Sequence, residues 1–182
     1  KLEKELELWV KHKDSTQYSL FKTYDFCVLS GKLGPKRKQG DYQVPEGFYH
    51  IDRFNPWSAF HLSLGINYPN VADKRSNNGN LGGDIFIHGN CVSIGCIPIT
   101  NECVEELYVL AVEAKNNGQK KIPVHIFPFK MHEAQMNIVS SVLQDQNLKK
   151  FWTNLSKGFQ YFEEKKTLPK VTISSTGEYV CS

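Results

Sequence analysis

The sequence contains no apolar run close to the roughly 20 residues that a membrane-spanning helix requires. It also has no internal repeat, no low-complexity tract and no segment with the polar bias of a disordered tail. These absences exclude a helical membrane protein, a repeat protein and a largely disordered chain. A length of 182 residues fits one domain with an appended segment and is sufficient to bury a real core.

A secretory signal is also absent. Because the chain begins at Lys1 rather than Met, we expect a trimmed N-terminus from which a signal peptide has been removed. The 22 Lys and Arg residues nearly balance the 19 Asp and Glu residues, and no nucleic-acid-binding motif is present. A net charge of +3 is therefore compatible with an anionic cell-wall polymer without indicating one.

The five cysteines show no disulfide-framework spacing, and their odd number leaves at least one thiol unpaired. Cys27 and Cys103 are expected to be small buried apolar residues. A bridge between Cys91 and Cys96 is conceivable from their proximity, but it would block the thiol of Cys96, which the next motif makes important.

The segment from Asp84 to Pro98 carries the strongest indication of chemistry. Alternation places Ile85 and Ile87 on one face of a strand and His88 at its end on the other face. A short loop of small residues then leads to Cys96. A cysteine nucleophile needs such an arrangement, because an imidazole must accept the thiol proton and backbone N–H groups must bind an oxyanion.

These residues resemble the YkuD-type L,D-transpeptidases, which carry a His-Gly step followed by Ser-His-Gly-Cys. This chain has His88-Gly89 followed by Ser93-Ile94-Gly95-Cys96, and the short gap between the two elements resembles the YafK-like murein L,D-transpeptidase subgroup. The resemblance extends to residues 31–49 upstream and to residues 122–129 and 151–158 downstream.

The chain departs from the family pattern at two positions. Ile94 stands where the wider family has a second histidine, and Pro98 stands where the family usually has an arginine. Both family residues help to position substrate. With two apolar residues there instead, we expect hydrolysis or a narrow choice of acceptor to be favoured over general cross-linking.

The resemblance implies the roles of the site residues. Cys96 would be the nucleophile and His88 its base, with an ion pair between them that lowers the pKa of the thiol. The backbone N–H groups of Gly95 and Cys96 would bind the oxyanion, and the Gly89 carbonyl would orient the imidazole. Ser93 would either act directly or bond the backbone of its own loop.

Two other interpretations of the same residues are weaker. Cys91 is a rival nucleophile, but it matches no nucleophile of the family. His88, Cys91, Cys96 and Cys103 could supply four zinc ligands, although their spacing is not that of a zinc knuckle or ribbon. We therefore expect neither a metal nor a cofactor.

The basic cluster formed by Lys32, Lys36, Arg37 and Lys38 lies in a turn-rich stretch, residues 31–40, that is expected to stay exposed. The simplest interpretation of the cluster is a solvated loop. The alternative is contact with the carboxylates of a peptide.

The resemblance implies an α+β fold, with a β-rich catalytic domain over residues 1–130 and a helical C-terminal extension over residues 131–182 packed on it. Periodicity predicts strands in the N-terminal third, a capped helix over residues 101–117 and an edge strand at 122–129. Helices are expected over 134–143 and 151–162. Residues 67–83, rich in Asn, Gly and Asp, are expected to form a long surface loop.

The implied activity is acyl transfer on peptidoglycan stem peptides in the periplasm or cell envelope. In the family, the cysteine attacks the L-centre carbonyl of the third stem residue, often a diaminopimelate. An amine acceptor then gives a cross-link, whereas water gives an L,D-hydrolase. One YafK-like member releases a lipoprotein from the wall, so a wall-linked lipoprotein is an alternative partner. A non-catalytic wall-binding module is the rival from a different class.

Overall fold

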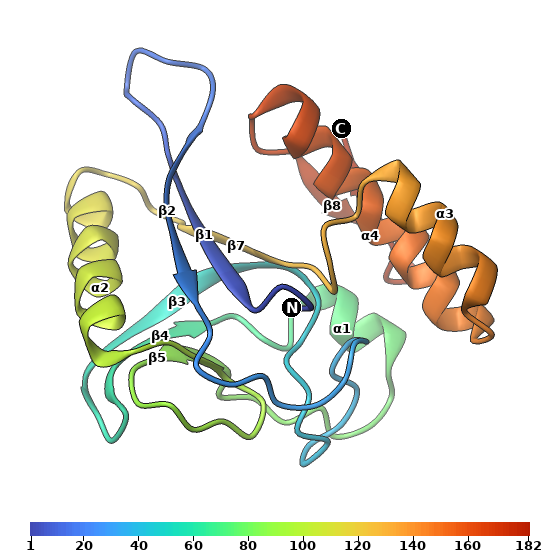
Figure 1. Ribbon diagram of the computed structural model, residues 1–182, viewed down its shortest axis with the longest axis horizontal. Helices are drawn as coiled ribbons and strands as arrows, with labels where there is room; N and C mark the ends of the chain where they lie inside the picture. Colours follow the sequence, from blue (N-terminus) through green and yellow to red (C-terminus); the bar gives the residue numbers. More distant parts are fainter.

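The computed structural model describes residues 1–182. It has the predicted α+β fold, in which a central five-stranded sheet lies between helix α2 on one side and the helices α3 and α4 on the other (Figure 1). The strands are β1 (Glu5–Val10), β2 (Ser19–Asp25), β3 (Gly47–Ser58), β4 (His61–Ile66), β5 (Phe86–His88), β6 (Ile97–Pro98), β7 (Pro123–Ile126), β8 (Val171–Ile173) and β9 (Tyr179–Cys181). The helices are α1 (Val71–Ser76), α2 (Asn101–Asn116), α3 (Glu133–Val142) and α4 (Gln146–Lys165).

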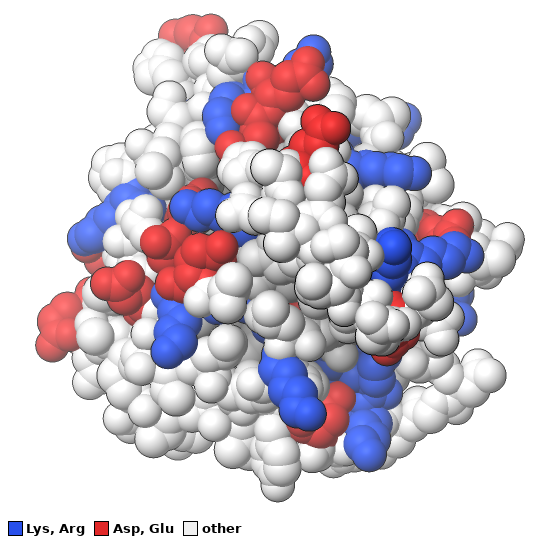
Figure 2. Space-filling model, turned by 45° about the vertical axis from the view of Figure 1, so that its right-hand side comes forward, with Lys and Arg blue, Asp and Glu red and all other residues white.

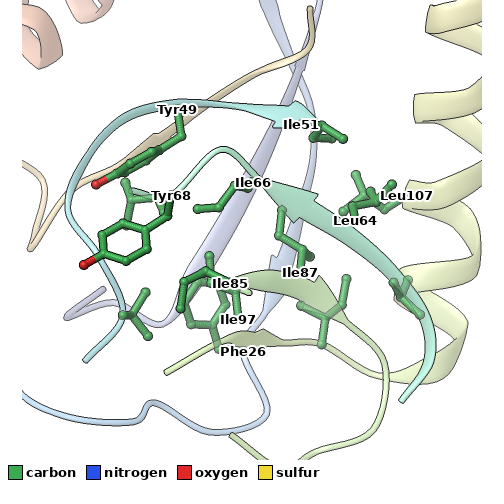
Figure 3. Packing of buried hydrophobic residues seen from close by; sticks show 14 of the residues in the cluster. Phe26, Tyr49, Ile51, Leu64, Ile66, Tyr68, Ile85, Ile87, Ile97 and Leu107 are labelled. Carbon is green, nitrogen blue, oxygen red and sulfur yellow. The ribbon is translucent and has the colours of Figure 1, made fainter. Parts of the chain in front are cut away.

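The central sheet has the strand order β6-β5-β4-β3-β7, so the strand predicted at 122–129 is an edge strand as expected. Strand β5 pairs antiparallel with β4 and parallel with β6. Its core face carries Ile87, which is level with Leu64 on β4 and Ile97 on β6. Figure 3 shows these three side chains pointing into one apolar cluster together with Leu107 of α2. Burial of each such side chain contributes about 1.5–3 kcal/mol.

Helix α2 is confirmed nearly to the residue. Thr100 caps it, because the Thr100 Oγ1 accepts a hydrogen bond from the backbone N–H of Cys103 at 3.3 Å. Val104, Leu107 and Ala111 are its buried residues, as their helical spacing predicts. The cap, two residues after β6, fixes where helix α2 begins.

The expectation of an exposed loop at residues 31–40 is wrong for part of this segment. Lys36 is buried, and its ammonium contacts the Asp41 carboxylate at 2.6 Å. The guanidinium of Arg37 lies over the ring of Phe151. A lysine in this loop can be buried because a carboxylate five residues later neutralises it, a pairing that composition alone does not reveal.

The expectation of a surface loop at residues 67–83 is also wrong, because this segment contains α1 and buries Tyr68 and Leu81. Asn70 and Asp73 form a capping box at the start of the helix. Six residues are too few to show helical periodicity in a sequence, so side-chain caps and tertiary packing determine this element.

The C-terminal part contains both predicted helices and one element that was not predicted, the β8–β9 hairpin. Helices α3 and α4 help to form a second apolar cluster with Phe48 and Phe129. The hairpin is held to α4 by Asn154, which bonds the backbone N–H and carbonyl of Tyr179. The division of the chain at residue 130 stays a prediction.

No helix is both long and apolar enough to cross a membrane. On the face shown in Figure 2, Lys and Arg side chains are interspersed with Asp and Glu side chains. That distribution matches the near balance of charges in the sequence.

Candidate active site

The register of the sheet brings the residues of the sequence motif onto one face. His88 is level with Ser63 on β4 and with Pro98 on β6, whereas Ile87 and Ile97 face the core. Cys96 immediately precedes Ile97, so alternation places Cys96 on the same face as His88. The predicted base thus ends β5, and the predicted nucleophile immediately precedes the adjacent strand β6, two residues before the partner of His88.

The imidazole of His88 is held in one orientation. Its Nδ1 lies 2.5 Å from the Gly89 carbonyl oxygen, as predicted. A carbonyl can only accept a hydrogen bond, so Nδ1 carries the proton and Nε2 of the neutral ring is left as an acceptor. Burial lowers the pKa of His88, although the hydrogen bond to Gly89 opposes that shift. The neutral, basic form is therefore favoured.

The ring of Phe60 covers the imidazole, with the two ring centroids 4.8 Å apart. Phe60 follows the β3 strand and lies 28 residues before His88 in the chain, so no local pattern indicated it. Gly89 is equally constrained, because a Cβ there would lie 2.6 Å from the Asn101 side chain and 3.1 Å from the Phe60 carbonyl. The His-Gly step is thus required by close packing against α2 and the β3–β4 turn.

Ser93 and Gly95 determine the shape of the loop before Cys96. The Ser93 hydroxyl donates to the Cys96 carbonyl at 2.8 Å and accepts from the Gly95 N–H at 3.1 Å. Gly95 has a φ of +130°, which favours glycine. Ser93 therefore bonds the backbone of its loop. Of the two predicted oxyanion donors, the Gly95 N–H is thus already bonded to Ser93, whereas the Cys96 N–H makes no hydrogen bond within the chain.

The thiol of Cys96 donates to the Asp84 carbonyl at 3.6 Å. Burial raises its pKa, and the nearby Asp84 carboxylate adds to that shift, while a hydrogen bond with the Phe86 backbone opposes it. Burial therefore shifts the pKa values of the Cys96 thiol and the His88 imidazole in the directions that favour their neutral forms. The thiolate–imidazolium ion pair stays a prediction, and the burial of both groups opposes it.

A disulfide joins Cys27 to Cys91, so the expectation that Cys27 is an unpaired buried residue is wrong. The bridge removes Cys91 as a rival nucleophile and as a zinc ligand, whereas Cys96, Cys103 and Cys181 are free. No group of three or more His, Cys, Asp or Glu side chains could hold a metal ion. The disulfide ties the loop before Cys96 to the segment that follows β2.

The two departures from the family pattern differ in their surroundings. Ile94 is 77% exposed at the loop beside Cys96, whereas Pro98 is fully buried in β6. Neither supplies a polar group to the site.

The site matches a known family of catalytic domains. The family model for the YkuD L,D-transpeptidase catalytic domain matches residues 4–126, which include His88 and Cys96. The chain belongs to the YkuD family. This finding supports action on peptidoglycan as a transpeptidase or hydrolase.

Among curated relatives, "Putative L,D-transpeptidase YafK" of Escherichia coli K12 is 39% identical over 184 aligned residues, covering 100% of this chain and 71% of the relative. The same protein from strain O157:H7 gives the same values. Among solved structures, the helical cell shape determining protein Pgp2 of Campylobacter jejuni superposes with a TM-score of 0.53 at 20% identity. That match covers 96% of this chain and 70% of Pgp2, and it shows a shared fold.

Proposed function

We propose that this YkuD domain is a cysteine acyltransferase or hydrolase acting on peptidoglycan stem peptides, with Cys96 as nucleophile and His88 as base. The observation that supports the proposal most directly is the orientation of the His88 ring. Because Nδ1 donates to the Gly89 carbonyl, Nε2 is the proton acceptor on the face that carries Cys96.

From a neutral thiol and a neutral imidazole, the reaction begins with a proton transfer. As the Cys96 sulfur attacks the peptide carbonyl carbon, the thiol proton passes to His88 Nε2 and the carbonyl oxygen becomes an oxyanion bound by the Cys96 N–H. Collapse of the tetrahedral intermediate breaks the peptide C–N bond, and the departing amine takes the proton from His88. A thioester remains on Cys96.

The acceptor in the second half of the reaction determines the product. An amine or a water molecule attacks the thioester carbon, His88 accepts its proton, and the Cys96 sulfur leaves as the thiol when His88 returns that proton. Which acceptor wins depends on whether an amine is held close enough to compete with water. The apolar Ile94 and Pro98 beside Cys96 favour hydrolysis over general cross-linking, and release of a wall-linked lipoprotein would be one form of that hydrolysis.

The Cys27–Cys91 disulfide supports a location in the cell envelope, because disulfides persist in oxidising compartments and are rare in the cytosol. Peptidoglycan, the substrate class of the family, lies in the same compartment. Both considerations favour a periplasmic site of action.

Incubation with defined tetrapeptide muropeptides, followed by mass spectrometry, tests the proposal. We expect the wild-type protein to form tripeptide product with a free terminal amino acid, and the Cys96→Ala protein to form none. Abundant 3→3 cross-linked dimer with little tripeptide would establish transpeptidation and contradict the hydrolytic preference. Binding of muropeptides without any turnover would overturn the enzymatic proposal in favour of a wall-binding module.

A further inference from the structure

We propose that Arg53 is a specificity-determining residue that binds a free carboxylate of the stem peptide beside Cys96. The inference rests on the proposed function and deepens it, because it names the group of the substrate that the site recognises. Three features support it: a β-bulge in β3, the glycine Gly65 on β4, and N–H groups of Arg53 that have no hydrogen-bond partner. All three lie on or point to the sheet face that holds the site.

A β-bulge aims Arg53 at this face. Ile51 is level with Ile66 and both are buried in the core, yet Arg53 is level with Gly65, the residue just before Ile66. Strand β3 therefore contains one residue more than β4 over this step. Residues two apart in a regular strand share a face, but the extra residue, Asp52, reverses the direction of Arg53. Without the bulge, Arg53 would point into the apolar core.

Gly65 provides the path that the arginine side chain follows. Gly65 is level with Arg53 on one side and with Phe86 on the other, so the three residues form one row across β3, β4 and β5. A Cβ at Gly65 would lie 2.9 Å from Arg53 Nε and 3.0 Å from the Phe86 ring. The missing side chain lets the Arg53 side chain lie flat across β4 and bring its guanidinium over Phe86, 4.8 Å from the ring centroid.

The Arg53 guanidinium and the Cys96 thiol both form hydrogen bonds with Asp84. Arg53 Nη1 donates to the Asp84 carboxylate at 2.6 Å, and the Cys96 thiol donates to the Asp84 carbonyl at 3.6 Å. Asp84 itself has a φ of 56°, in the left-handed region that, apart from glycine, mainly asparagine, aspartate and histidine adopt. Through Asp84, the Arg53 guanidinium is therefore held near Cys96, the proposed nucleophile.

Arg53 retains donors for a ligand. A guanidinium has five N–H groups. Within the chain, Nε donates to Asp52 at 3.2 Å and Nη1 donates once to Asp84, which leaves three N–H groups unused. The Arg53 side chain is 42% exposed, so it is not closed off from a ligand. A planar fork of N–H groups matches a carboxylate, and the Phe86 ring beneath limits its movement.

Stability does not account for this arrangement. An ion pair as exposed as Arg53–Asp84 contributes little to folding, since the Asp84 side chain is 81% exposed. The bulge and the glycine each cost regular strand pairing or backbone entropy. A stem peptide offers two carboxylates near the scissile bond, one on the third residue and one at the C-terminus. Both have the chemistry that Arg53 recognises.

The test compares three tetrapeptide muropeptides, one with both carboxylates free, one amidated on the third residue and one amidated at the C-terminus. We expect wild-type kcat/KM to fall about 10- to 100-fold for one of the amidated peptides, because a charge-assisted pair is lost. The kcat/KM of Arg53→Gln for the free peptide should equal that of the wild type for the discriminated amidated peptide. Amidation should cause no further fall in the kcat/KM of Arg53→Gln. Arg53→Lys should be intermediate, and Arg75→Gln on α1 is the matched control.

Calorimetric binding of the same peptides to the inert Cys96→Ala protein, with and without Arg53→Gln or Arg53→Lys, separates this inference from the proposed function. Arg53-dependent preference for a free carboxylate, even with no turnover by the wild type, would support the inference and overturn only the proposed activity. An equal loss on all three peptides when Arg53 is replaced would overturn the inference and leave the activity intact. If Arg53→Gln does not fold, an Arg53→Lys protein with undiminished discrimination would also overturn it.

Discussion

At the residue scale, the proposed nucleophile is one of three free thiols. Cys91 is bonded to Cys27, and Cys103 lies on α2, whereas Cys96 shares a sheet face with His88. Replacing Cys96 with Ala should abolish turnover of muropeptides and leave folding intact, because the partly exposed thiol contributes little packing. Cys103→Ala is the matched control and should keep nearly full activity. Turnover retained by Cys96→Ala would remove it as nucleophile.

Removing the Cys27–Cys91 disulfide should affect stability more than activity. Cys91→Ala should retain most activity per folded molecule, but thermal unfolding should show a loss of stability of about 2–4 kcal/mol because a 64-residue loop is no longer closed. Complete loss of activity in a folded Cys91→Ala protein would mean that the bridge also shapes the loop of the nucleophile.

The protonation state of the pair gives a pH prediction. Burial raises the pKa of the Cys96 thiol above its ordinary value of 9.0. The thiolate fraction, and with it the rate of alkylation by iodoacetamide, should therefore rise about tenfold per unit from pH 7 to pH 9. Peptide mass spectrometry would follow Cys96 separately from the other free cysteines. A plateau in the alkylation rate extending below pH 7 would instead demonstrate a preformed ion pair with His88.

At the element scale, the capping box of α1 carries a buried carboxyl group. Burial raises the pKa of Asp73 from 3.8 to about 6, although hydrogen bonds from the Asn70 backbone and the Tyr49 hydroxyl oppose the shift. A pKa that is higher in the folded state means that the protonated form stabilises the fold below pH 4. That stabilisation is lost as the pH rises through 6.

The measurable consequence concerns Asp73→Asn, which keeps the shape of the side chain and removes the ionisation. Relative to wild type, its free energy of unfolding in urea should improve between pH 4 and pH 7 by roughly 2–3 kcal/mol. The Asp14→Asn protein, altered in an exposed loop, is the control. A constant difference between wild type and Asp73→Asn across this pH range would show that the carboxyl group does not titrate there.

Sequence patterns predicted the elements whose residues repeat over several turns or strand steps. The stripe of Val104, Leu107 and Ala111 was sufficient for α2, and the alternation of Ile85 and Ile87 placed His88 on the outer face. Sequence periodicity did not predict the short elements. Six residues of α1 and the three-residue strands β8 and β9 are stabilised mainly by contacts with distant segments.

At the scale of the whole molecule, one buried carboxylate connects the sheet to the C-terminal helices. Glu46 precedes β3 and is fully buried. It accepts a hydrogen bond from the Trp152 indole of α4 at 2.8 Å and another from the Gly34 N–H at 2.8 Å. The helical part is thus joined to the catalytic part by a specific polar contact as well as by apolar packing.

Trp152→Phe tests this connection. It keeps an aromatic ring but leaves one oxygen of Glu46 without its donor, and the free energy of unfolding in urea should fall by about 1–3 kcal/mol. Trp57→Phe is the matched control, because Trp57 is 92% exposed, and its stability should be unchanged. Equal stability of the two variants would show that the contact between Glu46 and Trp152 does not stabilise the fold.

The sequence by itself determined the local chemistry. His88, a glycine-containing loop and Cys96 lie within nine residues, so their relation depends mainly on strand alternation and turn geometry. The orientation of the imidazole by the Gly89 carbonyl is similarly local, since the two residues are adjacent.

The tertiary structure decided what surrounds that chemistry. The bond between Cys27 and Cys91 spans 64 positions, and the contact between Arg53 and Asp84 spans 31. Such pairings depend on strand register, on a bulge that reverses one side chain and on close packing at glycines. The pKa shifts of Cys96 and His88 likewise follow from burial, which arises only when distant segments pack together.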